Sequence, residues 1–402
     1  MPTDTTLREV VETLAAIERP PCSAGERQAA EWLAARFEGA GCSPVDLEEE
    51  DAWGGYLPTS AALGLVASAG AVLALRGRRV LGTTAALAAA AALVDDVQNG
   101  SRAVRRLLRS RRRTVNVVAR CGDPAADRTL VVLAHHDAHQ AGRFYDQGLQ
   151  QAIHRLAPDL LARLKTSPPQ WWIGLAGPLL TAAGGMTGRR RPLRAGLVLT
   201  LLATAIVAEI ASRETVPGAN DNLSGVAGLV ALAELARERP PDGLRLLLVS
   251  CGAEESLQEG MRGFVARHRG DLDPRRTWFL NLETVGSERL IMLEGEGPIW
   301  MEDYTDPEFR DLVGDSAAAA GVPLERGFRA RASTDSVIPS RAGYPTATLT
   351  SLTPWGALAN YHLPTDTPDN VDYGTVERAV RVARKVTESL SAQRTGDQPV
   401  RQ

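Results

Sequence analysis

The chain has 402 residues, a formal net charge of −3 and 44% hydrophobic residues. This length allows one large α/β domain or two smaller domains with a sizeable core. The near-neutral charge gives no reason to expect binding to nucleic acid. Four cysteines, Cys22, Cys42, Cys121 and Cys251, are scattered without a C-x-x-C spacing. We therefore expect neither a thiolate zinc site nor a disulfide framework.

The amino-terminal segment has the pattern of a folded domain. Residues 5–18 and 26–41 have the spacing of amphipathic helices, and Ser23 with Glu26 forms a capping box at the start of the second one. A strand-like segment at 43–48 follows. Residues 1–30 contain no apolar stretch of the kind found in a signal peptide, so we expect none.

Two pairs of uncharged, apolar stretches interrupt this pattern. Each pair is separated by an arginine-rich turn, which predicts two helical hairpins with basic tips. The stretches are residues 57–75 and 80–94, then 171–187 and 195–208. We expect the hairpins to lie in inserted segments 52–113 and 139–212, and residues 1–50 and 114–392 to form one discontinuous α/β domain. A disordered tail is predicted for 393–402.

The hairpins allow two interpretations. They insert into a bilayer, or they form a helical lid or a contact between copies of the chain in a soluble enzyme. Crossing ~30 Å of hydrocarbon takes about 20 residues. The first stretch is long enough and the third, with Trp171 and Trp172 at its start, nearly so. The second and fourth are short. We expect membrane association, and the hairpin surfaces also offer a site for a homo-oligomer.

A basic segment follows the first hairpin. The simplest interpretation of this segment is a solvated helix face. Because it lies next to an apolar hairpin, we expect it to contact an anionic lipid membrane. Its seven arginines are Arg102, Arg105, Arg106, Arg109, Arg111, Arg112 and Arg113.

The charges do not decide the orientation in the membrane. The hairpin tips carry three and four arginines, which favours tips in the cytoplasm, and the basic segment on the other side favours the opposite. Residues 1–50 belong to the predicted catalytic fold and no signal peptide precedes them. We therefore predict a cytoplasmic catalytic domain at the cell membrane, which suits unpaired cysteines. A soluble cytoplasmic enzyme is the alternative.

From residue 114 onward, strands alternate with helices. Such alternation predicts a three-layer α/β sandwich with a mostly parallel sheet covered on both faces. Strands are expected at 114–121, 128–134, 244–250, 278–284 and 346–351, and helices at 224–239, 258–269, 306–320 and 373–392. In such sheets, functional sites gather beyond the carboxyl ends of the strands.

Imidazoles and carboxylates follow several of these strands. Taken singly, each is more often a solvated or core side chain than a ligand. Together they have the composition of a site for two divalent ions, since histidine with carboxylates suits zinc and one shared carboxylate can bridge two ions. The adjacent Glu254 and Glu255 repel each other unless cations offset their charge. The candidate ligands are His135, Asp221, Glu255, Glu283 and His362.

The motifs around these residues resemble a known family. They are His-x-Asp at 135–137, Gly-Ala-Asn-Asp-Asn-Leu-Ser-Gly at 218–225, Glu-Glu at 254–255, Asn-Leu-Glu at 281–283 and Tyr-His-Leu-Pro-Thr-Asp-Thr at 361–367. This order is similar to that of the co-catalytic zinc aminopeptidases of the glutamate-carboxypeptidase and glutaminyl-cyclase type. The resemblance covers 1–50 loosely and 114–390 well. It implies a mixed sheet of about eight strands, two zinc ions and a metal-activated water that attacks a peptide or amide carbonyl.

The resemblance also implies a role for each residue. His135 holds the first ion, Asp221 bridges both ions, and Glu255 with His362 holds the second. The implied catalytic residues are Glu254 as general base, Asp137 as the carboxylate that orients His135, and Tyr361 as a phenol that stabilises the oxyanion. Asp335 corresponds to an acidic residue behind the ligands.

Two departures from the family pattern bear on these roles. Glu283 stands where the family usually has aspartate, so the first site could take a divalent ion other than zinc. His136 and His139 add imidazoles near the site, and we expect them to be structural or substrate-facing. The sequence thus predicts a metallopeptidase that acts on a peptide or small amide. The alternatives are a glutaminyl-cyclase-like acyl transferase with one zinc, or a non-catalytic receptor-like member, which the full ligand set disfavours.

Overall fold

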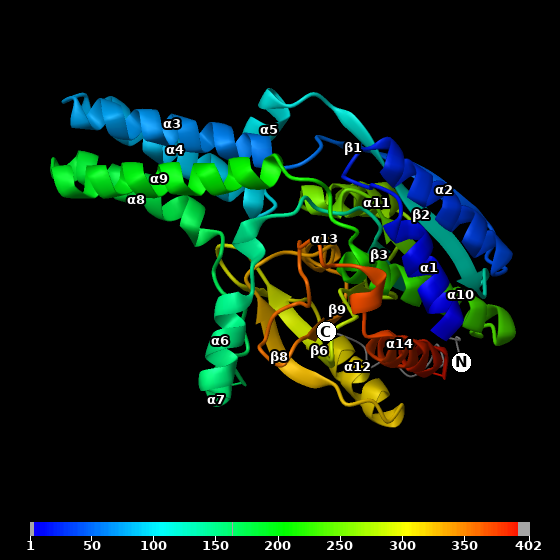
Figure 1. Cartoon of the computed structure of the whole chain (residues 1–402). Coiled ribbons are helices and arrows are strands. Elements are labelled where there is room, and N and C mark those ends of the chain that lie inside the picture. The colour runs from blue at the N-terminus through cyan, green and yellow to red at the C-terminus, as the bar shows by residue number, and fades with distance from the viewer. Residues whose placement is uncertain (1–3, 163, 393–402) are drawn as a thin grey trace.

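A nine-stranded sheet forms the centre of an α/β domain in the computed structural model, which describes residues 4–162 and 164–392 (Figure 1). The strands follow the order β1-β2-β4-β3-β5-β9-β6-β7, and β8 pairs with β6. The predicted tail at 393–402 lies outside the described residues. The strands are β1 (Val45–Ala52), β2 (Arg112–Gly122), β3 (Thr129–His135), β4 (Arg245–Cys251), β5 (Thr277–Glu283), β6 (Arg289–Glu296), β7 (Glu302–Asp303), β8 (Glu325–Ala330) and β9 (Thr346–Leu352).

The sheet is mixed, as predicted, but it is less parallel than expected. Its centre, β4-β3-β5-β9, is parallel, and so is the pair β6–β8. The pairings β1–β2, β2–β4, β6–β7 and β6–β9 are antiparallel. The parallel centre aligns the carboxyl ends of β3, β4 and β5 at one edge, where functional residues of such sheets gather.

Helices cover both faces of the sheet and make the predicted three-layer sandwich. Leu130 and Val132 of β3 pack in the core beneath α1, α2, α10, α12 and α14. Val131 and Leu133 pack in a second core with α11 and α13. Burial on both faces explains why β3 is a continuous apolar run. These helices are α1 (Asp4–Ala15), α2 (Ala24–Gly39), α10 (Ser224–Glu238), α11 (Glu259–His268), α12 (Pro307–Ala319), α13 (Val337–Arg341) and α14 (Tyr373–Ala392).

Shorter elements connect these layers. Half of the predicted capping box forms at α2: Ser23 Oγ accepts a hydrogen bond of 3.0 Å from the Glu26 amide, but the Glu26 carboxylate accepts from the Cys22 amide, at 3.1 Å, and not from that of Ser23. The connecting elements are α5 (Ala103–Leu108), η1 (Arg143–Tyr145), α6 (Gly148–Leu156), α7 (Pro158–Ala162), η2 (Ala219–Leu223), η3 (Glu254–Ser256) and η4 (Pro368–Asn370).

The two hairpins form one four-helix bundle that projects from the α/β domain, with the arginine-rich turns at its far end (Figure 1). It consists of α3 (Leu57–Leu75), α4 (Arg79–Val97), α8 (Trp172–Thr187) and α9 (Arg190–Ala211). α3 packs against α9 and α4 against α8. Small residues allow close contact: a Cβ at Gly177 would lie only 2.9 Å from the Gly196 carbonyl oxygen.

Two helices of the bundle, α4 and α9, are longer than the uncharged stretches that they contain. α4 has 19 residues and α9 has 22, because both helices continue into the flanking charged residues. The second and fourth stretches suggested segments too short to cross a membrane. This is wrong for α4 and α9, the helices that contain them. α3, α4 and α9 are each long and apolar enough to cross a membrane.

The basic segment after the first hairpin packs against the α/β domain. Arg102 and Arg105 are buried, and Arg105 pairs with Asp96 at 2.8 Å. Both side chains also donate to backbone carbonyls, Arg102 to Leu257 and Arg105 to Ser256. The expectation of lipid contact is wrong for these two arginines, because burial removes them from the surface.

The cysteines differ from expectation as well. Cys42, which follows α2, is bonded to Cys121 of β2, whereas Cys22 and Cys251 are free. The prediction of unpaired cysteines is wrong for this pair. It had supported the cytoplasmic placement of the catalytic domain, and disulfides persist mainly in oxidising compartments. The cytoplasmic placement stays a prediction without that support.

Candidate metal centre

The predicted ligands come from five separate segments that meet at the carboxyl edge of the parallel strands. Because β3, β4 and β5 are aligned neighbours, their ends bring distant residues together. His135 ends β3, Glu283 ends β5, Glu254 and Glu255 form η3 after β4, Asp221 lies in η2 before α10, and His362 lies in the loop before η4.

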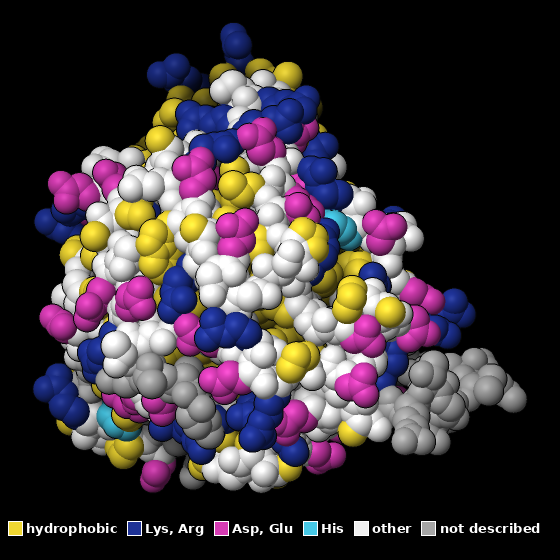
Figure 2. All heavy atoms as spheres, turned by 90° about the vertical axis from the view of Figure 1, so that its right-hand side faces the viewer, with side chains coloured by type: hydrophobic (Ala, Val, Ile, Leu, Met, Phe, Trp, Pro, Cys, Tyr) yellow, Lys and Arg dark blue, Asp and Glu magenta, His cyan; other side chains and the backbone are white. Residues whose placement is uncertain are grey.

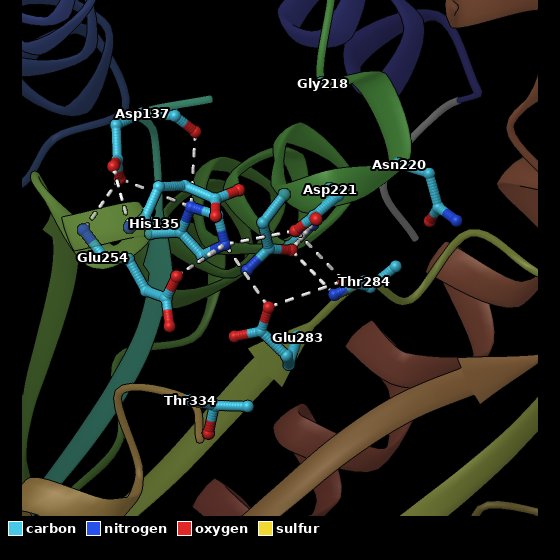
Figure 3. Close-up of polar contacts among 12 residues, drawn as sticks. His135, Asp137, Gly218, Asn220, Asp221, Glu254, Glu283, Thr284 and Thr334 are labelled. Carbon is cyan, nitrogen blue, oxygen red and sulfur yellow. Dashed lines mark hydrogen bonds and ion pairs between the residues drawn. The ribbon is translucent and has the colours of Figure 1, made fainter. Parts of the chain in front are cut away.

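His135 lies at the centre of one half of the site, with Asp221, Glu254 and Glu283 directed toward it (Figure 3). Its Nε2 atom lies 3.3 Å from Asp221 Oδ1 and 3.3 Å from Glu283 Oε1. Glu254 Oε2 is farther away, at 4.0 Å. One imidazole nitrogen and two carboxylate oxygens thus converge in a buried position, with Glu254 beside them.

His362 organises the other half in the same way. Its Nε2 atom lies 3.2 Å from Asp221 Oδ2 and 3.2 Å from Glu255 Oε1. The two oxygens of Asp221 therefore face two different histidines, one in each half of the site. This is the geometry required of a carboxylate that bridges two ions.

The donor atoms fit a pair of divalent cations. His135 Nε2, His362 Nε2 and Glu255 Oε1 are buried without a hydrogen-bond partner among the described residues. Leaving such atoms unsatisfied costs about 1–3 kcal/mol each. Without cations, burial also raises the pKa of Glu255 to about 6. Zinc bound by imidazole and carboxylate would satisfy these atoms and offset the clustered negative charge.

The turn that carries Asp221 is held by its neighbours on both sides. Asp366 accepts hydrogen bonds from the amides of Asn220, at 2.7 Å, and Asp221, at 3.1 Å. Asn222 Oδ1 accepts from the Thr284 amide at 2.8 Å, just after β5. The Asp221–Asn222 peptide bond is cis. Asp221 is thus fixed against β5 and the His362 loop at once.

Asp137 has two contacts in the site. Its Oδ1 lies 3.4 Å from His135 Nδ1, the position expected of a carboxylate that orients this imidazole. Its two oxygens also accept from the amides of Glu254, at 3.1 Å, and Glu255, at 3.0 Å. Asp137 therefore connects β3 to η3. Asp335 is fully buried, and burial raises its pKa to about 8.

Sequence reasoning missed the residue that positions Glu254. Gln258 Nε2 donates to Glu254 Oε1 at 2.6 Å, and Asn99 Nδ2 donates to Gln258 Oε1 at 2.8 Å. Asn99 follows α4 directly, so the base of the first hairpin connects to Glu254 through Gln258. No local motif signals this link, because the two amide residues lie far apart in the chain.

Aromatic side chains surround His362. His139 stacks on it at 4.0 Å between ring centroids, and Tyr361 stacks at 3.8 Å. His139 lies close enough to Glu255 and His362 to join a metal site. Its two ring nitrogens, however, already contact Gln140 O at 2.7 Å and Tyr56 Oη at 3.1 Å. These contacts support a structural role for His139.

Two further side chains near the candidate ligands are Tyr145 and His136. Tyr145, which the sequence did not single out, meets the edge of His362 at 4.6 Å between centroids. His136 Nδ1 lies 3.0 Å from Ser250 Oγ, and His136 belongs to none of the candidate ligand groups among the described residues.

Comparisons with known proteins agree with the motifs. Residues 205–387 match peptidase family M28, a range that includes Asp221, Glu255 and His362 but not His135. A comparison with curated proteins gave no match. The family match confirms the resemblance drawn from the motifs and supports a hydrolase.

Solved structures share the fold. The LapA aminopeptidase of Legionella pneumophila aligns with a TM-score of 0.55 and 10% identity over 97% of this chain and 72% of that one. A Zn-dependent exopeptidase from Parabacteroides distasonis aligns with a TM-score of 0.55 and 14% identity, over 97% and 98%. A glutaminyl cyclase from Bacteroides thetaiotaomicron gives 0.55 and 14%, over 96% and 97%. At these identities the likeness shows the fold alone.

Proposed function

We propose that the chain is a zinc-dependent metallopeptidase or amidohydrolase of the aminopeptidase type, with two ions in its site. One observation carries the proposal: the two carboxylate oxygens of Asp221 face His135 and His362 at 3.3 and 3.2 Å. A one-ion site needs no such bridge. His135, Asp221 and Glu283 would hold the first ion, and His362, Asp221 and Glu255 the second.

Glu254 is the general base of the proposed reaction. The bound ions would polarise the scissile carbonyl and would lower the pKa of water, which makes the water a better nucleophile at neutral pH. Glu254 then takes a proton from the attacking water and gives it to the leaving amine. Gln258 holds Oε1 of this carboxylate, which leaves Oε2 directed toward the site. Without cations, burial raises the pKa of Glu254 well above its usual value. The bound ions would lower it again, because nearby positive charge favours the carboxylate that accepts the proton.

Tyr361 is positioned to serve as a hydrogen-bond donor. Its ring lies against His362 and lines the cavity at the site. Burial raises the pKa of its phenol well above the usual value, so the hydroxyl keeps its proton at neutral pH. A protonated phenol can donate to the oxyanion that forms when water adds to the carbonyl.

An assay of the purified chain with amino-acid amides tests this function. We expect release of the free amine, loss of activity after chelation and recovery on addition of zinc, because the ligands fit a pair of such ions. A peptide with an amino-terminal glutamine is included for comparison. Cyclisation of this peptide, without hydrolysis of the other amides, would contradict the proposal and favour the glutaminyl-cyclase alternative.

We further propose that the four-helix bundle is inserted in a membrane. Its outer surface is apolar: Leu65, Val198 and Leu202 are 60%, 55% and 57% exposed. Soluble proteins rarely expose large contiguous apolar patches. The opposite end of the molecule differs, since acidic and basic side chains are interspersed over the face of the α/β domain turned away from the bundle (Figure 2).

Fractionation of cells that express the full chain tests this insertion. Because the helices themselves are apolar, we expect the protein to stay with membranes through salt and alkaline washes and to be released by detergent. Release without detergent would favour the soluble lid. Protease treatment of intact cells tests the orientation. Protection of the catalytic domain would agree with the predicted cytoplasmic side, and its cleavage would place this domain outside the cell.

A further inference from the structure

A cavity connects the metal centre to the interior of the four-helix bundle. Glu254, Glu255 and His362 line one end, and Gly64, Pro178 and Thr200 line the other. Its volume is about 150 Å³, counted over the positions that the centre of a water-sized sphere can occupy, and it is partly open to solvent. From this continuity we infer that the substrate is an amide bearing a long alkyl chain, which lies between the helices of the bundle. The inference rests on the proposed amide hydrolysis.

The chemistry of the cavity wall favours an apolar occupant. Among the described residues that line it, Glu254 and Glu255 at the metal centre are the only acidic ones, and no lysine or arginine lines it. A charged substrate group would therefore lack an ionic partner beyond the centre, where the polar side chains of Ser60, Gln170 and Ser333 are uncharged. Leu93, Ile173 and Val207 contribute to the wall farther in. Burial of each methylene there stabilises the complex by about 0.8 kcal/mol.

The threonine hydroxyl groups at the end of the cavity inside the bundle do not make that end polar. Thr200 Oγ1 donates to the Gly196 carbonyl at 2.8 Å, and Thr204 Oγ1 donates to the Thr200 carbonyl at 2.8 Å. Both donors are thus used within α9, and the two residues present largely apolar surface to the cavity. The deep end is suited to hydrocarbon.

The cavity is also deeper than an amino-acid side chain requires. Its lining along α9 runs from Ile210 to Thr200, about 15 Å at a rise of 1.5 Å per residue. An ordinary apolar peptide residue would fill only the part next to the metal centre. An amphiphile from the bilayer around the bundle would fill the whole length, with its amide at the metal centre.

The reaction on such a substrate is an ordinary hydrolysis. The amide C–N bond breaks, the oxygen of water bonds to the carbonyl carbon, and Glu254 transfers a proton from that water to the leaving amine. The products are a carboxylic acid and an amine, one of which carries the alkyl chain.

Chain-length dependence tests the inference with the full chain in detergent. Two series of amides are compared, one with acetyl, octanoyl and hexadecanoyl groups and one with matching N-alkyl groups. We expect kcat/KM to rise at least ~10-fold from the shortest to the longest member of one series, because buried methylenes add binding energy. A flat dependence in both series, with the short amides hydrolysed, would overturn the inference. If none of these amides is hydrolysed while amino-acid amides are, the inference fails and the proposed function stands. If amino-acid amides are not hydrolysed either, the proposed function itself fails.

Two matched variants on α9 locate the effect. Ala203 lines the cavity, whereas Ala205 on the same helix is exposed and is not part of the lining. Ala203→Trp should lower the ratio of long-chain to short-chain kcat/KM at least ~10-fold, because the indole occupies space needed by the chain. Ala205→Trp should leave the ratio unchanged. If Ala203→Trp does not fold, Val207→Phe repeats the comparison at another lining position. An unchanged ratio in the folded cavity variant would contradict the inference.

Discussion

Glu254→Gln should lower turnover at least ~10²-fold while the metal ions stay bound. Glutamine keeps the size of the side chain and can still contact Gln258, but it cannot accept a proton from water. Glu254 Oε2 lies 4.0 Å from His135 Nε2, farther away than Asp221 and Glu283, which agrees with a base beside the ligands. The loss should therefore appear in kcat and not in metal content.

The measurement is kcat and zinc per chain for the purified variant. Glu238→Gln, at an exposed position near the end of α10, is the matched control and should behave like the unmodified chain. Loss of zinc from the Glu254 variant would make this residue a ligand. Turnover close to that of the unmodified chain would exclude it as the base.

The sequence predicts the catalytic half of the fold well because its signals are local. β3 reads as a buried apolar run and ends at His135, and the segment that reads as a strand before Glu254 is β4. Parallel neighbours then bring these ends, and the candidate ligands at or just after them, to one edge of the sheet. Their distances, and the separate halves around Asp221, appear only in the folded chain.

The outer strands carry weaker signals. β8 reads Glu-Arg-Gly-Phe-Arg-Ala, and β7 has two residues, so neither shows the alternation or apolar run of a central strand. Both lie on the β6 side of the sheet, where solvent can accept charged side chains. Their pairing with β6 depends on tertiary contacts that a local pattern does not contain.

Long-range contacts account for the other differences. Cys42 and Cys121 are 79 residues apart and meet because the segment after α2 runs beside β2. Arg105 reads as part of a basic surface, yet the chain folds it onto Asp96 and η3. A charge pattern alone cannot distinguish an arginine at a membrane surface from one that joins an inserted hairpin to η3.

The central claim is that Asp221 bridges two ions, and zinc content per chain tests it most directly. Asp221→Ala removes one ligand from each half of the site, whereas His362→Ala removes a ligand from one half only. Loss of a direct ligand should weaken binding by more than the ~10–100-fold cost of losing an outer partner. Asp369→Ala, at an exposed aspartate in η4, is the control.

We expect two zinc ions per chain in the unmodified protein and in Asp369→Ala, one in His362→Ala, and loss of both in Asp221→Ala. One zinc ion in the unmodified protein, or equal zinc content in His362→Ala and Asp221→Ala, would contradict the bridge and with it the two-ion account.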